Sequence, residues 1–165
     1  MKKTLRNILP ITFILCFSLF AQNKPPNYKN PKTSNQKLIN LGEQDTNTSV
    51  RENKVINSIK KIETAIANRD IESLSDHLGS QTYLNLPNGI SGYYSANQAY
   101  FVLDDFLKTY RITSFSFDEI NTNSNTPFAT GNYEYDLKGN RNSARIYLQL
   151  RNTGKGWKIN QITIN

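Results

Sequence analysis

The stretch SANQAYFVLDDFLKTY, residues 95–110, decides the fold because it combines a helix start with a wide apolar stripe. Ser95 and Gln98 have the spacing of a capping box, in which the two side chains satisfy backbone N–H groups at the helix start. The apolar residues behind them recur at the three- and four-residue intervals of one helix face: Ala99, Val102, Leu103, Phe106, Leu107 and Tyr110. A stripe of this width is typical of a helix that lies on a sheet.

Downstream of this helix the apolar residues recur at every second position, which is the period of strands. Such alternation is found in three runs before the C-terminal one: Phe115–Phe117, Tyr133–Leu137 and Ile146–Leu150. Turn residues at Gly139-Asn140 and Gly154-Lys155-Gly156 separate the later runs, so we expect antiparallel neighbours.

The last run changes phase. Trp157 and Ile159 are at odd positions, whereas Ile162 and Ile164 are at even ones. One extra residue at Asn160-Gln161, a β-bulge, would keep all four apolar side chains on the same face of the sheet and bend the strand.

Upstream, a second capping-box spacing at Ser49 and Glu52 precedes an apolar stripe and predicts a helix over about 50–68. Its stripe consists of Val55, Ile59, Ile62 and Ile66. Asp70 is placed to cap a short helix with Ile71, Leu74 and Leu78 on one face. A strand over about 82–86 should follow, and the turn residues Pro87-Asn88-Gly89 end it.

Together these elements predict an α+β fold in which the helices of the N-terminal part pack on a strongly curved antiparallel sheet. The predicted single domain covers residues 49–165, which is long enough to bury one core without disulfides. We expect aromatic side chains to fill most of its interior, namely Phe101, Phe106, Phe115, Phe117, Phe128, Tyr133, Tyr135 and Trp157.

The N-terminal region has the pattern of an export signal. Lys2, Lys3 and Arg6 precede an apolar run of about 13 residues, shorter than the ~20 that a spanning helix needs. We therefore expect a cleavable signal peptide at 1–21, no membrane-spanning segment, and a location in the periplasm or outside the cell. Residues 22–48 are polar and proline-containing, and their composition predicts a disordered tether.

The basic excess does not fall on the predicted domain. The chain has a formal net charge of +7, but residues 55–165 carry eleven basic and ten acidic side chains. A nucleic-acid-binding domain would show its positive charge on the folded part. We therefore expect no nucleic-acid partner.

The order of elements resembles the nuclear-transport-factor-2-like superfamily, in which a bent sheet wraps a long helix into a cone. A narrower resemblance, over about 50–165, is to a bacterial family of exported proteins of unknown function in that superfamily. It rests on Gly92-Tyr93-Tyr94-Ser95 and the helix that follows, on Phe115-Ser116-Phe117, and on the closing Trp157-Lys158-Ile159 with Ile162-Thr163-Ile164. The pattern departs at Asp118-Glu119, where the family has a His followed by a Gly. The resemblance implies fold and compartment, and no activity.

Few residues point to chemistry. The sequence has no glycine-rich phosphate loop and no nucleophile elbow, and its one histidine, His77, lacks companions at metal-ligand spacing. We expect no cofactor and no metal. The side chains that could contact a ligand are Tyr93, Tyr94, Tyr133, Tyr135 and Trp157. Tyr93 and Tyr94 could equally pack beneath the helix that they precede.

Two functions of different class fit the sequence. The first is a non-catalytic binding or assembly module of the cell envelope, with an unknown protein or a small apolar ligand as partner. The second is an isomerase or hydrolase that uses Asp or Glu with Tyr inside the cone, as ketosteroid isomerase does. The strand face of Arg145, Tyr147, Gln149 and Arg151 could form a homodimer or simply be exposed.

Overall fold

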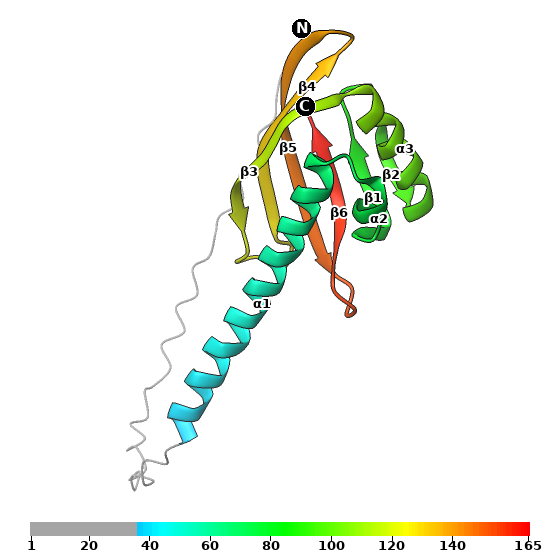
Figure 1. Ribbon diagram of the computed structural model, residues 1–165. Coiled ribbons are helices and arrows are strands. Elements are labelled where there is room, and N and C mark those ends of the chain that lie inside the picture. The colour runs from blue at the N-terminus through cyan, green and yellow to red at the C-terminus, as the bar shows by residue number, and fades with distance from the viewer. Residues whose placement is uncertain (1–35) are drawn as a thin grey trace, which may run out of the picture. The chain divides into compact units, whose positions relative to one another are not determined.

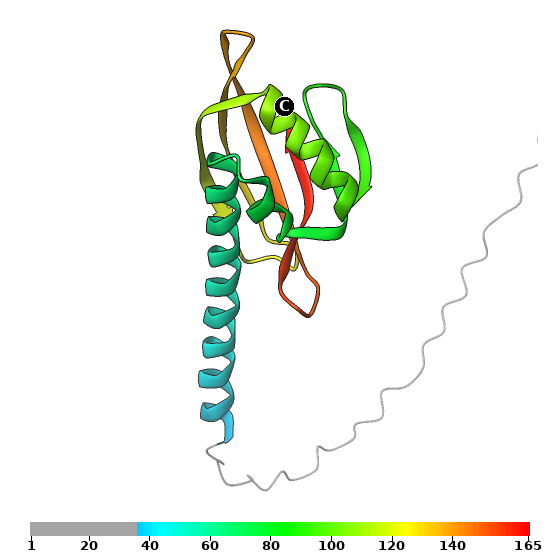
Figure 2. The ribbon, with the colours of Figure 1, turned by 45° about the vertical axis from the view of Figure 1, so that its right-hand side comes forward.

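The computed structural model describes residues 36–165, with side chains from residue 46 onward. Its elements follow one another in the order α1 (Gln36–Ala67), α2 (Ile71–Ser75), β1 (Leu78–Asn85), β2 (Ser91–Ser95), α3 (Ala96–Thr109), β3 (Arg111–Asn121), β4 (Phe128–Leu137), β5 (Asn140–Asn152) and β6 (Trp157–Ile164). The six strands form one sheet in the order β2-β1-β6-β5-β4-β3, and the three helices lie on the same side of it (Figures 1 and 2). The α+β expectation is confirmed.

The sheet is mixed rather than wholly antiparallel. Four of its five strand pairs are antiparallel, but β1 runs parallel to β6, with Leu84 opposite Ile162. This pairing joins segments far apart in sequence, and the helix α3 with the other strands forms the crossover between them. Local turn signals, which report only neighbouring strands, could not indicate it.

Helix α3 and the bulge in β6 are as predicted. Both hydrogen bonds of the capping box between Ser95 and Gln98 are present at the start of α3. In the β5–β6 ladder Gln149 lies opposite Gln161 and Leu150 opposite Ile159, so Asn160 is the extra residue. The bulge keeps the four apolar side chains of β6 buried on the helix side of the sheet.

Helix α1 starts earlier than predicted. It begins at Gln36, and the Ser49 hydroxyl donates to the Thr46 carbonyl inside the helix instead of capping its start. The expected start near Val50 was wrong because it followed the apolar stripe, whereas the Gln, Lys, Leu and Glu residues before it also favour a helix. The part of the predicted tether within the described residues, 36–48, is therefore helical. Residues 1–35, which include the predicted signal peptide, lie outside the described residues.

Two strand predictions also need correction. Strand β1 begins at Leu78, which had been assigned to the short helix, and not at Thr82. The Gly92-Tyr93-Tyr94 segment does more than precede helix α3, because it forms strand β2, which pairs with β1. Its five residues alternate too briefly to identify a strand from sequence.

The core lies between the helices and the inner face of the sheet, which we define as the face toward the helices. Aliphatic side chains supply most of it, including Val55, Ile59 and Ile62 of α1, which are fully buried. The expectation of an aromatic interior holds for Phe106, Tyr133, Tyr135 and Trp157, which are buried. It was wrong for Phe101, which is 61% exposed on α3, and for Phe128, which stacks on Tyr147 on the opposite face.

Candidate functional site: the outer face of the sheet

The opposite face of the sheet, which we call the outer face, carries no helix of the described residues (Figure 2). The strand register aligns its side chains in rows that cross the strands. One row runs through five strands from β2 to β4, because each residue lies opposite the next: Tyr93, Tyr83, Gln161, Gln149 and Phe128. The adjacent row holds Asn85, Thr163, Tyr147 and Thr130, and neither row has a charged side chain from β2 to β4.

Aromatic rings occupy both ends of these rows. The rings of Tyr83 and Tyr93 meet edge to face with centroids 5.1 Å apart, and Tyr93 is 68% exposed. The Tyr83 hydroxyl is 3.1 Å from the Ser91 hydroxyl. On the other side, Phe128 and Tyr147 stack with centroids 5.6 Å apart. Such pairs present rigid apolar area together with a polar tip, as residues at binding surfaces do.

Amide side chains fill the middle of the face and bond to one another. The Gln149 amide donates to the Tyr147 hydroxyl at 3.1 Å and accepts from the Asn160 amide at 3.0 Å. The Gln161 amide donates to the Thr163 hydroxyl at 3.1 Å. The bulge at Asn160 places the amide of Asn160 beside that of Gln149. The centre is therefore held in place yet keeps unused donors and acceptors.

Charged groups flank the two rows, and Arg145 and Asp118 both bond to the Thr130 hydroxyl of the second row. Arg145 forms a bidentate pair with Asp118, with distances of 2.5 and 3.0 Å, and also bonds to Asn132. The pair lowers the pKa of the Asp118 carboxyl, chiefly through the hydrogen bonds from Arg145. A register shift between Phe117 and Glu119 makes Asp118 the extra residue of a bulge in β3. This is the position where the sequence departs from the pattern of the resembled family, so the departure belongs to the outer face.

Two of the predicted ligand-contacting residues are part of the core. Tyr133 is fully buried, its hydroxyl donates to the Tyr110 carbonyl at 3.0 Å, and burial raises the pKa of that phenol. The ring of Tyr135 is 5.7 Å from it and is also buried. Glu134, between them in sequence, is exposed on the other face of β4. The phenols and this carboxylate therefore do not share a pocket.

The other three lie apart from one another. Tyr94 is opposite Thr82 on the inner face and packs partly buried against the core, whereas Tyr93 belongs to the outer face. Trp157 is buried, with the Arg51 guanidinium 5.4 Å from its ring centroid. The five residues thus do not form one site. Among the outer-face residues, alternation in the sequence predicted that Tyr147 and Gln149 share one strand face. No sequence pattern predicted that Tyr83 and Gln161 lie on the same face.

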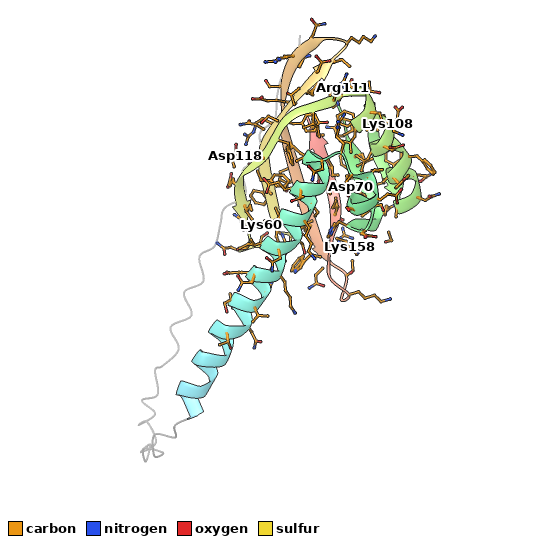
Figure 3. The ribbon with its side chains drawn as sticks, viewed as in Figure 1. Lys60, Asp70, Lys108, Arg111, Asp118 and Lys158 are labelled. Carbon is orange, nitrogen blue, oxygen red and sulfur yellow. The ribbon has the colours of Figure 1, made fainter. Side chains whose placement is uncertain are left out.

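A separate depression of about 490 Å³ lies between α1 and α2, and Lys60, Lys61, Thr64 and His77 are among its lining residues. Burial, with help from Lys158 and Lys61, lowers the pKa of His77. Figure 3 labels two of its lining residues, Lys60 and Asp70. Among residues 36–165 no three His, Cys, Asp or Glu side chains are grouped to hold a metal ion. No helix in this part of the chain is long and apolar enough to cross a membrane.

The arrangement of a curved six-stranded sheet over helices is that of the NTF2-like proteins. A structure from Streptomyces avermitilis, described as a candidate dehydratase of the NTF2-like family, matches with a TM-score of 0.55 at 12% identity over 70% of this chain and 96% of that one. A candidate isomerase from Bacillus subtilis matches with a TM-score of 0.55 at 14% identity, over 68% and 85% of the two chains. At these identities the likeness shows the fold alone.

Within this class the chain belongs to the family described as a domain of unknown function, DUF4783, which matches residues 59–165. A member from Bacteroides uniformis has a structure that matches with a TM-score of 0.58 at 18% identity, over 64% of this chain and 94% of that one. The resemblance seen in the sequence is confirmed. No curated protein matches the chain.

Proposed function

We propose that the chain is an exported, non-catalytic assembly module of the cell envelope that dimerises through the outer face of its sheet. The observation that carries this proposal is the composition of the two central rows of that face. Export is supported by the basic and apolar pattern of residues 1–21.

The outer face has the anatomy of a protein interface. Interface cores are depleted in charge and enriched in tyrosine and other aromatic residues, and their rims are polar. Here the rows hold Tyr83, Tyr93, Tyr147 and Phe128, and the Arg145–Asp118 pair borders them at Thr130. An isolated ligand subsite would need a concave pocket, whereas this surface follows a sheet.

A second copy of the chain fits this surface because amides are self-complementary. An Asn or Gln side chain both donates and accepts, so the same group can pair with its equivalent across a twofold axis. The area is close to the lower limit of a specific interface. Six strands about 4.8 Å apart and a length of about six residues give ~500 Å² on each copy. Two such faces approach the ~1,000 Å² that a specific interface requires.

The geometry gives less support to catalysis inside the cone. Two carboxylates, those of Glu134 and Asp136, are near Tyr133 and Tyr135 in sequence. Each lines a depression, and neither depression contains one of these tyrosines. An isomerase of this type needs its carboxylate base and its phenol in the same apolar pocket. The Streptomyces and Bacillus structures carry the names of enzymes, but their likeness to this chain is one of fold, and a shared fold does not establish a shared activity.

Sedimentation equilibrium tests the proposal. The wild-type protein should have twice the mass of one chain, and Gln161→Glu should be a monomer because it places two like charges in a desolvated interface. Asn97→Asp is also isosteric and adds the same charge, but at an exposed position of α3. This variant should leave the dimer intact. A monomeric wild type, or a Gln161→Glu variant as dimeric as wild type, would exclude this interface.

A further inference from the structure

Three arginines from three segments line one depression at the end of the sheet near the β4–β5 turn. The depression is about 440 Å³, and its lining residues come from the α1–α2 connection, the start of β3 and the β4–β5 hairpin: Arg69, Arg111, Ile112, Thr113, Asp136, Gly139 and Arg141. Figure 3 shows Arg111 at the start of β3, at the opposite end of that strand from Asp118. The depression is thus separate from the Arg145–Asp118 pair.

The strand register places two of the arginines on either side of a carboxylate. Arg111 lies opposite Asp136 in the β3–β4 ladder, and Asp136 lies opposite Arg141 in the β4–β5 ladder. Neighbouring strands are about 4.8 Å apart, so both guanidinium groups can reach the same point. Asp136 itself is engaged by the turn, since its carboxylate accepts the Gly139 N–H at 3.0 Å.

The three arginines have no resident ion-pair partner. Within the described residues two salt bridges form, Lys108–Asp104 and Arg145–Asp118, and neither includes Arg69, Arg111 or Arg141. Three guanidinium groups and the single carboxylate of Asp136 leave the depression with an excess of positive charge, which favours an anionic ligand. Lys108, which lies near Arg69 in an adjoining depression, is already paired.

Backbone conformation supports a role for this basic group. Arg69, with φ of 56°, and Lys138, with φ of 55°, are the two non-glycine residues of left-handed conformation in the described chain. Arg69 follows the end of α1, with its N–H bonded to the Ile66 carbonyl, at a position where glycine is usual. Lys138 precedes Gly139 in a tight turn where asparagine is usual. Arg69 therefore lines the depression in spite of an unfavourable left-handed backbone, whereas Lys138 is not one of the lining residues.

We propose that this depression binds a phosphate group through the guanidinium groups of Arg69, Arg111 and Arg141. Arginine presents a planar fork of donors that matches oxoanions, and three forks from three directions suit the several oxygens of a phosphate better than the two of a carboxylate. A free phosphate ester and the phosphate of a lipid headgroup share this chemistry. The inference does not depend on dimerisation, because these residues lie outside the two central rows.

The test uses two probes on the purified protein. Inorganic phosphate is titrated while amide chemical shifts are followed by NMR, and sedimentation with phosphatidylglycerol vesicles is compared with phosphatidylcholine vesicles. The double variant Arg111→Gln/Arg141→Gln should weaken binding about tenfold or more. The matched control Arg151→Gln/Lys155→Gln removes the same charge at the other end of β5 and should change binding little.

The outcomes separate the sources of the phosphate. Shifts at Arg69 and Gly139 with free phosphate support a soluble ester, whereas binding only to phosphatidylglycerol vesicles supports a lipid headgroup. Asp136→Asn should tighten either interaction because it removes the competing carboxylate. The proposal is overturned if neither probe binds, or if the control variant loses as much affinity as the arginine variant, since the interaction would then be a general effect of charge.

Discussion

The two faces of the sheet use the same strands for different purposes. On β5, Leu148 is fully buried on the inner face, whereas the next residue, Gln149, lies on the outer face and bonds to Tyr147 and Asn160. The inner face contacts α1 and α3 through apolar side chains, and its Tyr133 and Tyr135 share no depression with Glu134 or Asp136. The outer face has rings and amides but no charge in its central rows from β2 to β4. The comparison distinguishes an interior that stabilises the fold from an outer face that we propose to serve recognition.

The largest expected effect concerns the inner side. Phe106 is fully buried and stacks on Tyr110 with centroids 4.5 Å apart, so Phe106→Ala should lower the free energy of unfolding by ~3–5 kcal/mol. Phe101, five residues earlier on the same helix, is 61% exposed. Phe101→Ala should change stability by no more than ~0.5 kcal/mol. Urea unfolding measures both variants.

A different result would reverse the assignment of the two faces. Near-wild-type stability of Phe106→Ala, together with tight binding of a small apolar ligand, would mean that the interior is a binding site and not a packed core.

A smaller effect is expected at the margin of the core, where His77 is half-buried. Burial lowers its folded pKa below the usual value of about 6.5, so the folded state resists protonation. As pH falls below about 6.5, the unfolded chain binds a proton that the folded chain does not, and stability should decrease until the folded pKa is passed. His77 is the only histidine, so His77→Gln should remove this dependence. Urea midpoints between pH 7.5 and 5 measure it, and identical profiles for the two proteins would contradict the assignment.

Local patterns were enough to predict much of the inner face. The capping box of α3, its apolar stripe and the bulge at Asn160 were readable because each depends on residues within a few positions of one another. The packing of Tyr133 and Trp157 also followed from alternation. The early start of α1 was missed because its first turns have no apolar stripe, and β2 because it is short.

The outer face could be predicted only in part. Alternation along β5 assigned Tyr147 and Gln149 to one face, but their neighbours depend on register between distant strands. Tyr83 joins Gln161 only through the parallel β1–β6 pairing, which no local signal indicates. The arginine depression has the same origin, since Arg69, Arg111 and Arg141 are far apart in sequence and meet only in the fold.

The dependence of the unfolding midpoint on protein concentration tests the difference between the two faces most directly. If the outer face forms a dimer, the wild-type midpoint should rise with chain concentration, because association stabilises only the folded state. Gln149→Glu should fold, since its neighbour Leu148 and the inner face are unchanged, but its midpoint should not vary with concentration. A wild-type midpoint that stays constant over a hundredfold range of concentration would contradict the account.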